Sequence, residues 1–362
     1  MSDLEPITHS ELSTLRRCPR MHYFRYDLRL SPIRDQVYLR MGSAHHKGVE
    51  LHGNQTSDAE AIDGASADYL QPPPAGIDKH AWAIERETVR NLLAGWLWRY
   101  SADNIRPIAC ELAFEIPLVN PETGASSRTF VLAGKIDAIV QLPDGRLAVQ
   151  EVKTAGEDIG PEAAYWLRLR KDPQISLYYL AARAVGHDVA TVLYDVTRKP
   201  TIQPAAVAVL DDDGLKVVLD RDGNRVLTKQ GKPRQTSSTE DGYVLQTRPM
   251  TPEEWGSKLL ADIGERPDYY YQRREVPRLE DELTQFQAEL WQQAQQLMEC
   301  RRRAARLPRP QDAYFCNVGR FTCDHCPFAE ICLQSITVNP DAPPAGYEVR
   351  DELHPELIPE GD

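Results

Sequence analysis

Three strand-like segments in close succession, between residues 108 and 155, limit the folds that are open to this chain. They read IACELAFEIPLV, TFVLAGKIDAIVQL and RLAVQEVKTA, and turn sequences containing proline and glycine separate them at 121–124 and 143–145. A helix pattern follows, with Asp172 as N-cap, Pro173 as first helical residue and Gly186 as stop, and DVATVLYDVT then returns to strand. This order predicts an α/β fold, with a central mixed β-sheet flanked by helices.

The rest of the chain divides into regions by composition. We predict helices over 7–30, over 38–52 and from Asp78, with a loop or linker at 53–77, and we find no internal repeat. The regions expected are an N-terminal helical region at 1–105, the core at 106–200, a β-rich insertion at 201–275, a C-terminal helix with clustered cysteines at 276–336, and a disordered acidic tail at 337–362.

Composition restricts the location and the partners. No apolar run is long enough to cross a bilayer, and the N-terminus lacks the basic and apolar regions of a signal peptide, so we expect a cytoplasmic protein without membrane contact. Thiols stay reduced there, and the seven cysteines therefore favour metal or cluster binding over disulfides. The net charge of -12 argues mildly against non-specific binding of nucleic acid, although a local groove can still be positive.

Two charges stand on one face of the third strand-like segment. Side chains alternate along a strand, so Glu151 and Lys153 share a face with apolar neighbours, where charges are costly without partners or a task. A hairpin through 143–145 would bring Asp137 beside Glu151. Such paired carboxylates can bind Mg²⁺ or Mn²⁺, and Lys153 could orient a water nucleophile and offset developing charge. The alternative is a hairpin with a surface salt bridge.

Two further pairs lie one helical turn apart and therefore share a helix face: Gln174 with Tyr178, and His46 with Glu50. The complete order of motifs resembles the RecB-type branch of the PD-(D/E)XK nucleases. The matching segments are G-x-x-x-H at 42–46, G-x-x-D at 134–137, E-x-K at 151–153 and Q-x-x-x-Y at 174–178. The resemblance implies a restriction-endonuclease-like core.

The resemblance also implies roles for single residues. His46, Asp137 and Glu151 would be metal ligands together with the backbone carbonyl of Val152, and Lys153 would be the catalytic lysine. Gln174 and Tyr178 would support the site or contact DNA. His45 is adjacent to His46 and is the alternative histidine, although the spacing from Gly42 favours His46.

The cysteines form a second motif. Cys323, Cys326 and Cys332 have the spacing C-x2-C-x5-C, and Cys316 or Cys18 could supply a fourth ligand for zinc or for a four-iron cluster. The pattern is similar to the iron–sulfur nucleases of the same branch, which include AddB-type subunits and CRISPR-associated RecB-like exonucleases. That likeness implies a structural 4Fe-4S cluster on Cys18, Cys323, Cys326 and Cys332 that joins the N- and C-terminal helical segments. Cys110 and Cys300 read as ordinary apolar residues.

Positive charge is local, and it marks candidate contacts with DNA. A basic rim of this kind can track a phosphate backbone, while exposed aromatic rings can stack on unpaired bases. The basic candidates are Arg16, Arg17, Arg20, Arg25, Arg168, Arg170, Lys171, Arg301, Arg302, Arg303, Arg306 and Arg309, and the aromatic candidates are Tyr23, Phe24, Tyr314 and Phe315. The alternative for each basic run is a solvated helix face.

Together these features predict a metal-dependent DNA nuclease in which metal-activated water attacks a phosphodiester. Relatives of the exonuclease type favour processing of DNA ends or single strands, with a helicase or recombination protein as a possible partner, in recombination, phage replication or defence. Two alternatives stay open. One is a non-catalytic, cluster-bearing subunit that binds DNA or acts as a scaffold, and the other is a site-specific endonuclease.

Overall fold

A computed structural model describes residues 4–33, 37–74 and 76–358 of the chain. Its centre is a six-stranded mixed sheet in the order β1-β4-β5-β6-β11, with β3 paired to β4 off this path. The strands are β1 (Glu5–Ile7), β3 (Arg106–Val119), β4 (Ser126–Gln141), β5 (Leu147–Ala155), β6 (Val189–Arg198) and β11 (Tyr271–Glu275). The pairs β1–β4 and β5–β6 are parallel and the other pairs are antiparallel, so the predicted mixed α/β architecture is confirmed.

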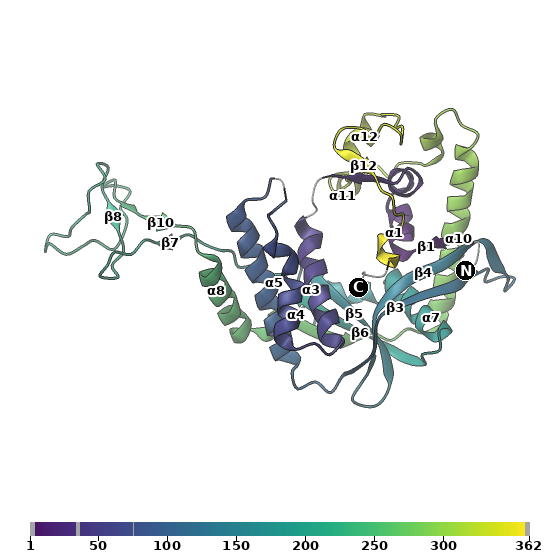
Figure 1. The fold of residues 1–362 in the computed structure, drawn as a ribbon, viewed down its shortest axis with the longest axis horizontal. Helices are drawn as coiled ribbons and strands as arrows, with labels where there is room; N and C mark the ends of the chain where they lie inside the picture. Colours follow the sequence, from purple (N-terminus) through teal and green to yellow (C-terminus); the bar gives the residue numbers. More distant parts are fainter. Residues whose placement is uncertain (1–3, 34–36, 75, 359–362) are drawn as a thin grey trace.

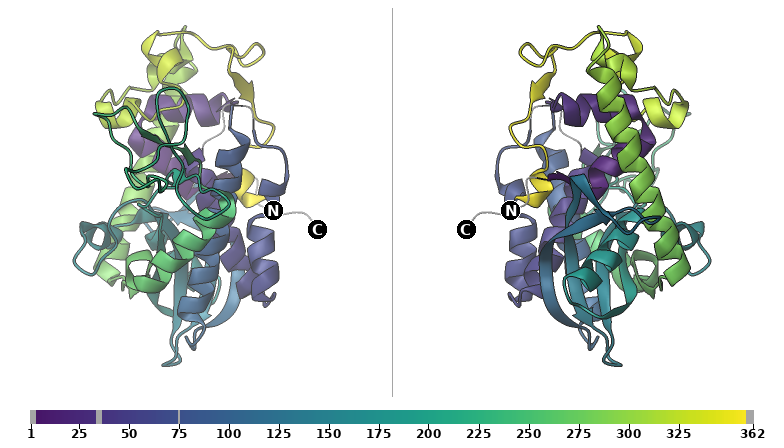
Figure 2. Two further views of the ribbon diagram at one scale, coloured as in Figure 1. Left: turned by 90° about the vertical axis from the view of Figure 1, so that its left-hand side faces the viewer. Right: turned by 90° about the vertical axis from the view of Figure 1, so that its right-hand side faces the viewer.

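Helices cover the sheet (Figures 1 and 2), and their apolar side chains pack with it in two main cores. The larger core joins one sheet face, through Val149 and Tyr194, to α1, α7 and α10. The second joins the sheet, through Val152 and Tyr271, to α3, α5 and α8. These helices are α1 (His9–Arg17), α3 (Val37–Gly53), α5 (Lys79–Tyr100), α7 (Pro173–Ala184), α8 (Pro252–Glu265) and α10 (Glu280–Ala304). Within the described residues, no helix is both long and apolar enough to cross a bilayer.

β4 and β5 separate part-way along their length. β4 and β5 are paired only over residues 138–141 and 147–150, whereas β5 continues beside β6 as far as Ala155. β1 pairs with β4 further along, at residues 130–132. The stretch of β4 around Asp137 therefore faces no ladder partner on that side. Beyond Gln150, the backbone groups of β5 that face β4 have no ladder partner. Because buried backbone groups need hydrogen-bond partners, we expect side chains to supply them where β4 and β5 diverge.

The N-terminal segment is less continuously helical than predicted. Residues 5–7 form β1, and Thr8 caps α1 by accepting a hydrogen bond from the amide of Glu11, as the sequence indicates. α1 ends at Cys18, which is extended because the following Pro19 disfavours the helical region for the residue before it. Two short helices follow, α2 (Pro19–His22) and a π-helix η1 (Tyr23–Asp27).

The prediction of a loop over 53–77 is wrong in part. Residues 58–65 form α4 (Asp58–Ala65), with a full capping box between Ser57 and Glu60, and η2 (Ala67–Leu70) follows. The small side chains of Ala61 and Ala65 are buried, so this helix packs closely in spite of its polar composition. Composition alone suggested a linker because it weighted the glycines and serines above the capping pattern.

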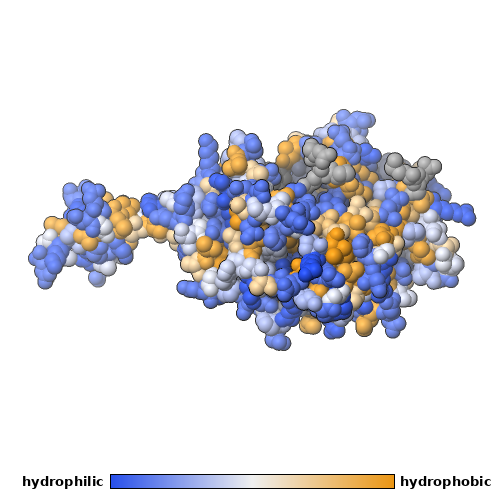
Figure 3. Space-filling view, turned by 60° about the horizontal axis from the view of Figure 1, so that its bottom comes forward, coloured by the Kyte–Doolittle hydropathy of each residue, from blue (hydrophilic) through white to orange (hydrophobic). Residues whose placement is uncertain are grey.

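Residues 205–250 form an arm that projects from the body, as Figures 1 and 3 show. It contains only two-residue strands: β7 (Val207–Ala208), β8 (Val218–Leu219), β9 (Val244–Leu245) and β10 (Thr247–Arg248). Its turns repeat, a feature that we did not find in the sequence. In successive turns the side chains of Asp211, Asp220 and Thr228 each accept a hydrogen bond from the amide four residues later.

The expected β-rich insertion at 201–275 ends earlier than proposed. Residues 252–265 form α8, which packs against α5, and residues 271–275 form β11 at the edge of the central sheet. The capping box of Thr251 and Glu254 and the following Pro252 at the first helical position account for the start of α8. The arm is thus an insertion between β6 and a helix of the core.

The expectation of a disordered tail at 337–362 is also corrected for the part that is described. β12 (Tyr347–Val349) pairs with β2 (Leu30–Pro32), and the ring of Tyr347 stacks on Phe328. η4 (Pro355–Leu357) then brings the tail back to α1, where Thr8 donates a hydrogen bond to Glu356. Proline-rich composition concealed these contacts because they join segments more than 300 residues apart. Residues 359–362 lie outside the described range.

Candidate nuclease site

Asp137 occupies the gap where β4 parts from β5. Its Oδ2 accepts a hydrogen bond from the amide of Val152 at 3.0 Å and so satisfies a backbone group that the sheet leaves without a ladder partner. The side chain is mostly buried, and burial raises its pKa to about 7, against the opposing effect of the Val152 amide. The predicted approach of Asp137 to the E-x-K segment is therefore present in the structure.

Glu151 and Lys153 project from β5 toward α7, on one face as the alternation predicts. The ammonium of Lys153 lies 2.8 Å from Glu151 Oε1, donates to Gln174 Oε1 at 3.0 Å and lies 3.7 Å from Asp172. Burial raises the pKa of Glu151 to about 8, and the charge of Asp137 adds to this shift while Lys153 opposes it. Burial alone would lower the pKa of Lys153, but the carboxylates of Glu151 and Asp172 raise it above its usual value.

The second carboxylate oxygen of Glu151, Oε2, differs from Oε1 because it has no hydrogen-bond partner among the described residues. Glu151 is only 2% exposed. A buried carboxylate oxygen left without a partner costs free energy, on the order of a few kcal/mol. Such an orphaned oxygen beside a second buried carboxylate fits a place for a cation. The salt-bridge alternative accounts for Oε1 and leaves Oε2 unexplained.

The Q-x-x-x-Y pair adjoins the same group. Gln174 follows the N-cap Asp172, accepts from Lys153 and donates to the hydroxyl of Tyr178 at 3.2 Å. Burial raises the pKa of Tyr178, with Glu151 and Asp137 adding to the shift, so this hydroxyl stays protonated. Asp172 was read from the sequence only as a helix cap, and the structure shows that it also faces Lys153.

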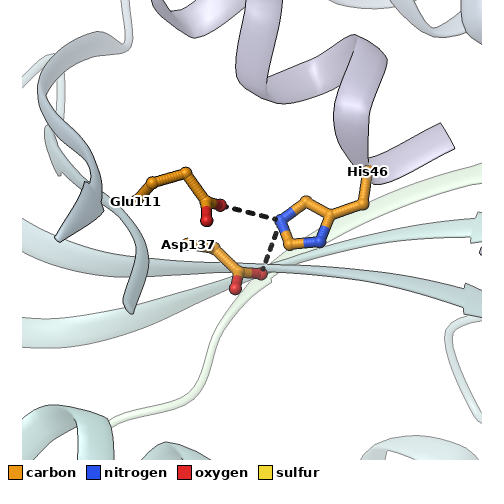
Figure 4. Close-up of side chains that lie close together, drawn as sticks. All are labelled: His46, Glu111 and Asp137. Atoms are coloured by element: carbon orange, nitrogen blue, oxygen red, sulfur yellow. Dashed lines mark ion pairs between the residues drawn. The ribbon is translucent and has the colours of Figure 1, made fainter. Parts of the chain in front are cut away.

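His46 reaches the site from α3 and meets a carboxylate that the sequence did not indicate (Figure 4). Its Nε2 lies 3.4 Å from Asp137 Oδ2 and 3.6 Å from Glu111 Oε1. Glu111 belongs to β3 between the ladder pairs of residues 110 with 138 and 112 with 136, so it stands opposite Asp137. Only the register of β3 against β4, with a φ of 50° at Glu111, could have revealed it. Lys135 of β4 forms an ion pair with Glu111.

His45 is placed differently from its neighbour. Its side chain is fully buried, and burial lowers its pKa to about 3, whereas His46 is partly exposed at the site. The geometry therefore agrees with the spacing argument that favours His46. Glu50, one turn after His46, pairs with Lys47 at 3.1 Å.

Two cavities meet at these residues. One, of about 420 Å³, is bordered by the start of α1, by α3, by β3 and β4, and by the tail residue Glu356. The other, of about 670 Å³, runs between α3, α5 and the sheet and includes Trp96 and Tyr100. His46, Glu50 and Asp137 line both cavities, so a flexible chain molecule can reach Asp137 from two sides.

The cysteines gather in a lobe formed by α2, α11 (Arg320–Cys323) and α12 (Ala329–Leu333). One pocket is lined by Cys18, Cys316, Cys323, Cys326 and Cys332. The Sγ atoms of Cys316 and Cys332 lie 3.8 Å apart, and burial together with Cys316 raises the pKa of Cys332 to about 12. Bonds between the segments at 17–20 and 314–322 hold the two chain ends together at this lobe. The remaining cysteines, Cys110 and Cys300, lie elsewhere.

Most of the basic candidates have protein partners. Arg301 pairs with Glu5 and Asp27, which makes it a structural link between α10 and the N-terminus. Arg16 contacts His9 at the cavity wall, and Arg170 and Arg303 are exposed. The other partners are Thr322 for Arg17, Tyr314 and Asp312 for Arg20, Glu157 for Arg168, Glu282 for Lys171, Glu299 for Arg302, and Ser335 and Asp312 for Arg309.

The aromatic candidates for base stacking are corrected. Tyr23, Phe24 and Tyr314 are buried at 8%, 0% and 1% exposure and belong to the larger core, so they cannot stack on DNA in this structure. Their rings pack against one another and against Phe328. Phe315 is 55% exposed and stays available. Residue type alone did not separate the two situations.

Comparison with known proteins agrees with this geometry. A family model described as the PD-(D/E)XK nuclease superfamily matches residues 6–333. The chain belongs to the PD-(D/E)XK nuclease superfamily. Nucleases of this superfamily cleave phosphodiesters with the help of divalent metal ions, so membership suggests a metal-dependent nuclease.

Other comparisons add little to this assignment. A search of curated proteins finds no match. Among solved structures, the chain is similar to one described as "Crystal structure of SSO0001", with 12% sequence identity and a TM-score of 0.33, over 93% of this chain and 90% of that one. A likeness at that TM-score supports no conclusion about this PD-(D/E)XK nuclease.

Proposed function

We propose that this PD-(D/E)XK nuclease is a deoxyribonuclease that degrades DNA from ends or as single strands. The observation that carries the proposal is the buried oxygen of Glu151 that has no hydrogen-bond partner, near Asp137, on a strand whose Lys153 contacts Glu151 and Asp172. A structural salt bridge needs no second buried carboxylate. The non-catalytic alternative is disfavoured for the same reason, because a scaffold needs none of these three residues.

Each residue of the proposed site would have its own role. His46, Asp137, Glu151 and the carbonyl of Val152 would hold Mg²⁺ or Mn²⁺, and three of these four ligands are the oxygen donors that such ions prefer. Such an ion, when bound, lowers the pKa of water and polarises a phosphoryl oxygen. Lys153 would orient the attacking water and offset charge on the phosphate, since Gln174 and Asp172 fix its ammonium. Tyr178 would position Gln174 through their hydrogen bond.

The cavities suggest how DNA would reach the site. A single strand could enter through one cavity and leave through the other, because both include His46 and Asp137. Arg16 lies at this passage and Arg170 is exposed at the start of α7, so both stay candidates for phosphate contacts. The preference for ends over internal sites rests on the resemblance to exonucleases of the RecB-type branch.

We also propose that the cysteine lobe binds a structural 4Fe-4S cluster through Cys18, Cys323, Cys326 and Cys332. A tetrahedral zinc site would place its sulfurs about 3.8 Å apart, from Zn–S bonds of ~2.3 Å. Among the described residues, no three thiol sulfurs lie within 4.8 Å of one another, so the five cysteines of the lobe are not arranged as a preformed tetrahedral zinc site, although Cys316 and Cys332 alone have that spacing. Cys316, close to Cys332, remains the alternative fourth ligand.

A cleavage assay tests the nuclease proposal. End-labelled single- and double-stranded DNA and closed circular DNA are incubated with anaerobically purified protein in Mg²⁺, Mn²⁺ or EDTA. We expect metal-dependent loss of linear DNA, sparing of the circle, and no cleavage by Lys153→Met, while Lys229→Met on the arm behaves as the parent. Discrete fragments from the circle would indicate a site-specific endonuclease. Absence of cleavage by the folded parent protein would favour the scaffold alternative.

Cysteine variants test the cluster proposal. The anaerobic protein should be brown, absorb near roughly 400 nm as iron–sulfur proteins do, and contain iron and sulfide in equal amounts. Cys18→Ser should remove this absorbance, whereas Cys316→Ser and the buried control Cys300→Ser should keep it. A colourless protein that contains zinc would refute the cluster. Loss of colour in Cys316→Ser but not in Cys18→Ser would identify Cys316, in place of Cys18, as the fourth ligand.

A further inference from the structure

The C-terminal segment runs from the cysteine lobe to the cavity beside Asp137 (Figure 1). Near the lobe, β12 pairs with β2, and the amide of Arg350 donates a hydrogen bond to the carbonyl of Arg29 at 2.9 Å. From there η4 brings Glu356 to the wall of the cavity of about 420 Å³ that Asp137 also lines. Neither the sequence motifs nor the proposed attack of water on a phosphodiester gives this glutamate a role.

Contacts on two sides hold η4 in this place. Thr8, the N-cap of α1, donates a hydrogen bond to Glu356 Oε1 at 2.8 Å. His354 is buried, and its Nε2 lies 3.4 Å from Glu11 Oε2 while its Nδ1 lies 3.6 Å from Glu356 Oε1. Glu11 is only 1% exposed, and its other oxygen lies 2.8 Å from His22 Nε2. A packed set of side chains therefore positions the carboxylate of Glu356, rather than a single surface contact.

Glu356 places a negative charge at the cavity wall. Two other carboxylates of the same cavity are paired with lysines, Glu50 with Lys47 and Glu111 with Lys135. Among the described residues, no lysine or arginine forms an ion pair with Glu356, and its side chain is 37% exposed. An anion that reaches this wall of the cavity therefore meets a charge that no permanent cation neutralises.

The charge of Glu356 distinguishes between the two ways in which a nucleotide can end. Burial acts to raise the pKa of Glu356, but hydrogen bonds with His354 and Thr8 outweigh it and hold the pKa below its usual value. A carboxylate and a phosphodiester are both anions without a proton to donate, so they repel each other at close range. A sugar hydroxyl at a strand end can instead donate a hydrogen bond to the carboxylate, and such charge-assisted bonds are stronger than neutral ones.

We propose that Glu356 is a specificity-determining residue that selects strand ends carrying a hydroxyl and disfavours strands that continue with a phosphate. The inference rests on the proposed nuclease function, and it names the kind of DNA end that the site accepts. A cavity of about 420 Å³ is of the size in which proteins bind single small molecules, and one terminal nucleotide is such a molecule. The preference for ends would then arise from this chain's own C-terminal segment, and Glu356 would take no part in the attack of water.

Binding of short single strands to the metal-free protein tests this selection without reference to cleavage. Fluorescence anisotropy in EDTA compares internally labelled oligonucleotides that carry a hydroxyl or a phosphate at the 5′ or the 3′ end. At one of the two ends, we expect the parent to bind the hydroxyl form about fivefold more tightly, which corresponds to about 1 kcal/mol for one like-charge contact. Glu356→Gln should lose that preference, whereas Glu352→Gln, an exposed carboxylate of the same segment, should keep it.

Cleavage of closed circular single strands gives the second measurement. Glu356→Gln should cut circles that the parent spares, and Glu356→Asp, which keeps the charge, should spare them. The amide oxygen of glutamine can still accept the hydrogen bond from Thr8, so the fold should survive the substitution, as thermal melting can check.

Two results would overturn the inference: a parent that binds hydroxyl and phosphate ends equally, or a Glu356→Gln variant that keeps the parent's preference. Failure of the nuclease proposal looks different. No variant would then cleave DNA, while the difference in binding between the parent and Glu356→Gln would remain.

Discussion

Replacing Asp137 with asparagine should stabilise the metal-free protein at neutral pH, although it should abolish cleavage. The carboxyl is buried and its pKa is raised to about 7. Asparagine carries no charge, and its Oδ1 can still accept the hydrogen bond that the amide of Val152 donates. The substitution therefore removes the cost of a buried charge and keeps the contact that closes the gap between β4 and β5.

The magnitude follows from proton linkage. Between the ordinary pKa of 3.8 and the folded-state pKa of about 7, the folded protein holds a proton on Asp137 that the unfolded chain has lost. Stability of the parent therefore falls as pH rises through this window, by about 1.4 kcal/mol per pH unit, and levels off above about pH 7. From pH 5 to pH 7 the parent should lose about 2 kcal/mol relative to Asp137→Asn, because the slope is already halved at the folded-state pKa.

Urea unfolding in EDTA, followed by tryptophan fluorescence at pH 5, 6, 7 and 8, measures this difference. Groups distant from the site that titrate in the same range cancel when the two proteins are compared at each pH. Glu151 does not cancel, because the charge of Asp137 contributes to its raised pKa, and its contribution increases the difference in the same direction. Asp144→Asn in the exposed turn at 143–145 is the matched control and should not change the pH dependence in this way. Addition of Mg²⁺ should reverse the order at pH 8, because the ion stabilises only the protein that retains its ligand.

A stability difference that stays constant from pH 5 to pH 8 would refute the reasoning, because it would mean that Asp137 titrates with an ordinary pKa in the fold. A variant less stable than the parent at pH 8 in EDTA would show that the Val152 contact needs the full charge. Either result would contradict the interpretation that burial of Asp137 without a cation destabilises the fold at neutral pH.

Three further changes test the support of the site. Arg278→Lys should lower the free energy of unfolding by about 2–4 kcal/mol in urea, since the buried guanidinium bonds Leu169 O and Tyr194 near α7; a loss under about 1 kcal/mol would contradict this. Asp195→Asn should cost about 3–5 kcal/mol in the same assay, because Asp195 pairs with Arg273 inside the fold, and an unchanged midpoint would count against it. Replacing residues 209–246 by a short Gly-Ser linker should keep the melting temperature of the body, as calorimetry can check, since β7 and β10 pair at the base of the arm; loss of cooperative melting would show that the arm supports the core.

Periodicity and short motifs predicted the positions of the site residues that lie on β5 and on α7. Alternation along β5 placed Glu151 and Lys153 on one face, and one-turn spacing placed Gln174 beside Tyr178, as the structure has them. The hairpin argument brought Asp137 to β5. These inferences succeed because they depend on the backbone geometry within a segment or across one turn.

Other features depend on register and on contacts between distant segments. Glu111 meets Asp137 only because β3 pairs with β4 in one register, and no local pattern fixes that register. The tail reached α1 through Glu356, although its composition indicated disorder. The stacking candidates failed for a related reason: Phe24 and Tyr314 are aromatic residues near basic ones in sequence, and packing between the two chain ends buries them.

The convergence of the chain ends connects the cysteine lobe to the cavity beside Asp137. α1 is a rigid element of nine residues with Cys18 at its C-terminal end, and its first turn, including His9, lines the cavity beside Asp137. Burial lowers the pKa of His9 to about 4, so this wall presents a neutral ring rather than a positive charge. Bonds from Arg17 and Arg20 to the segment at 314–322 fix the far end of α1. We therefore expect a change in how the cysteines are held to shift the cavity wall, because α1 connects the two.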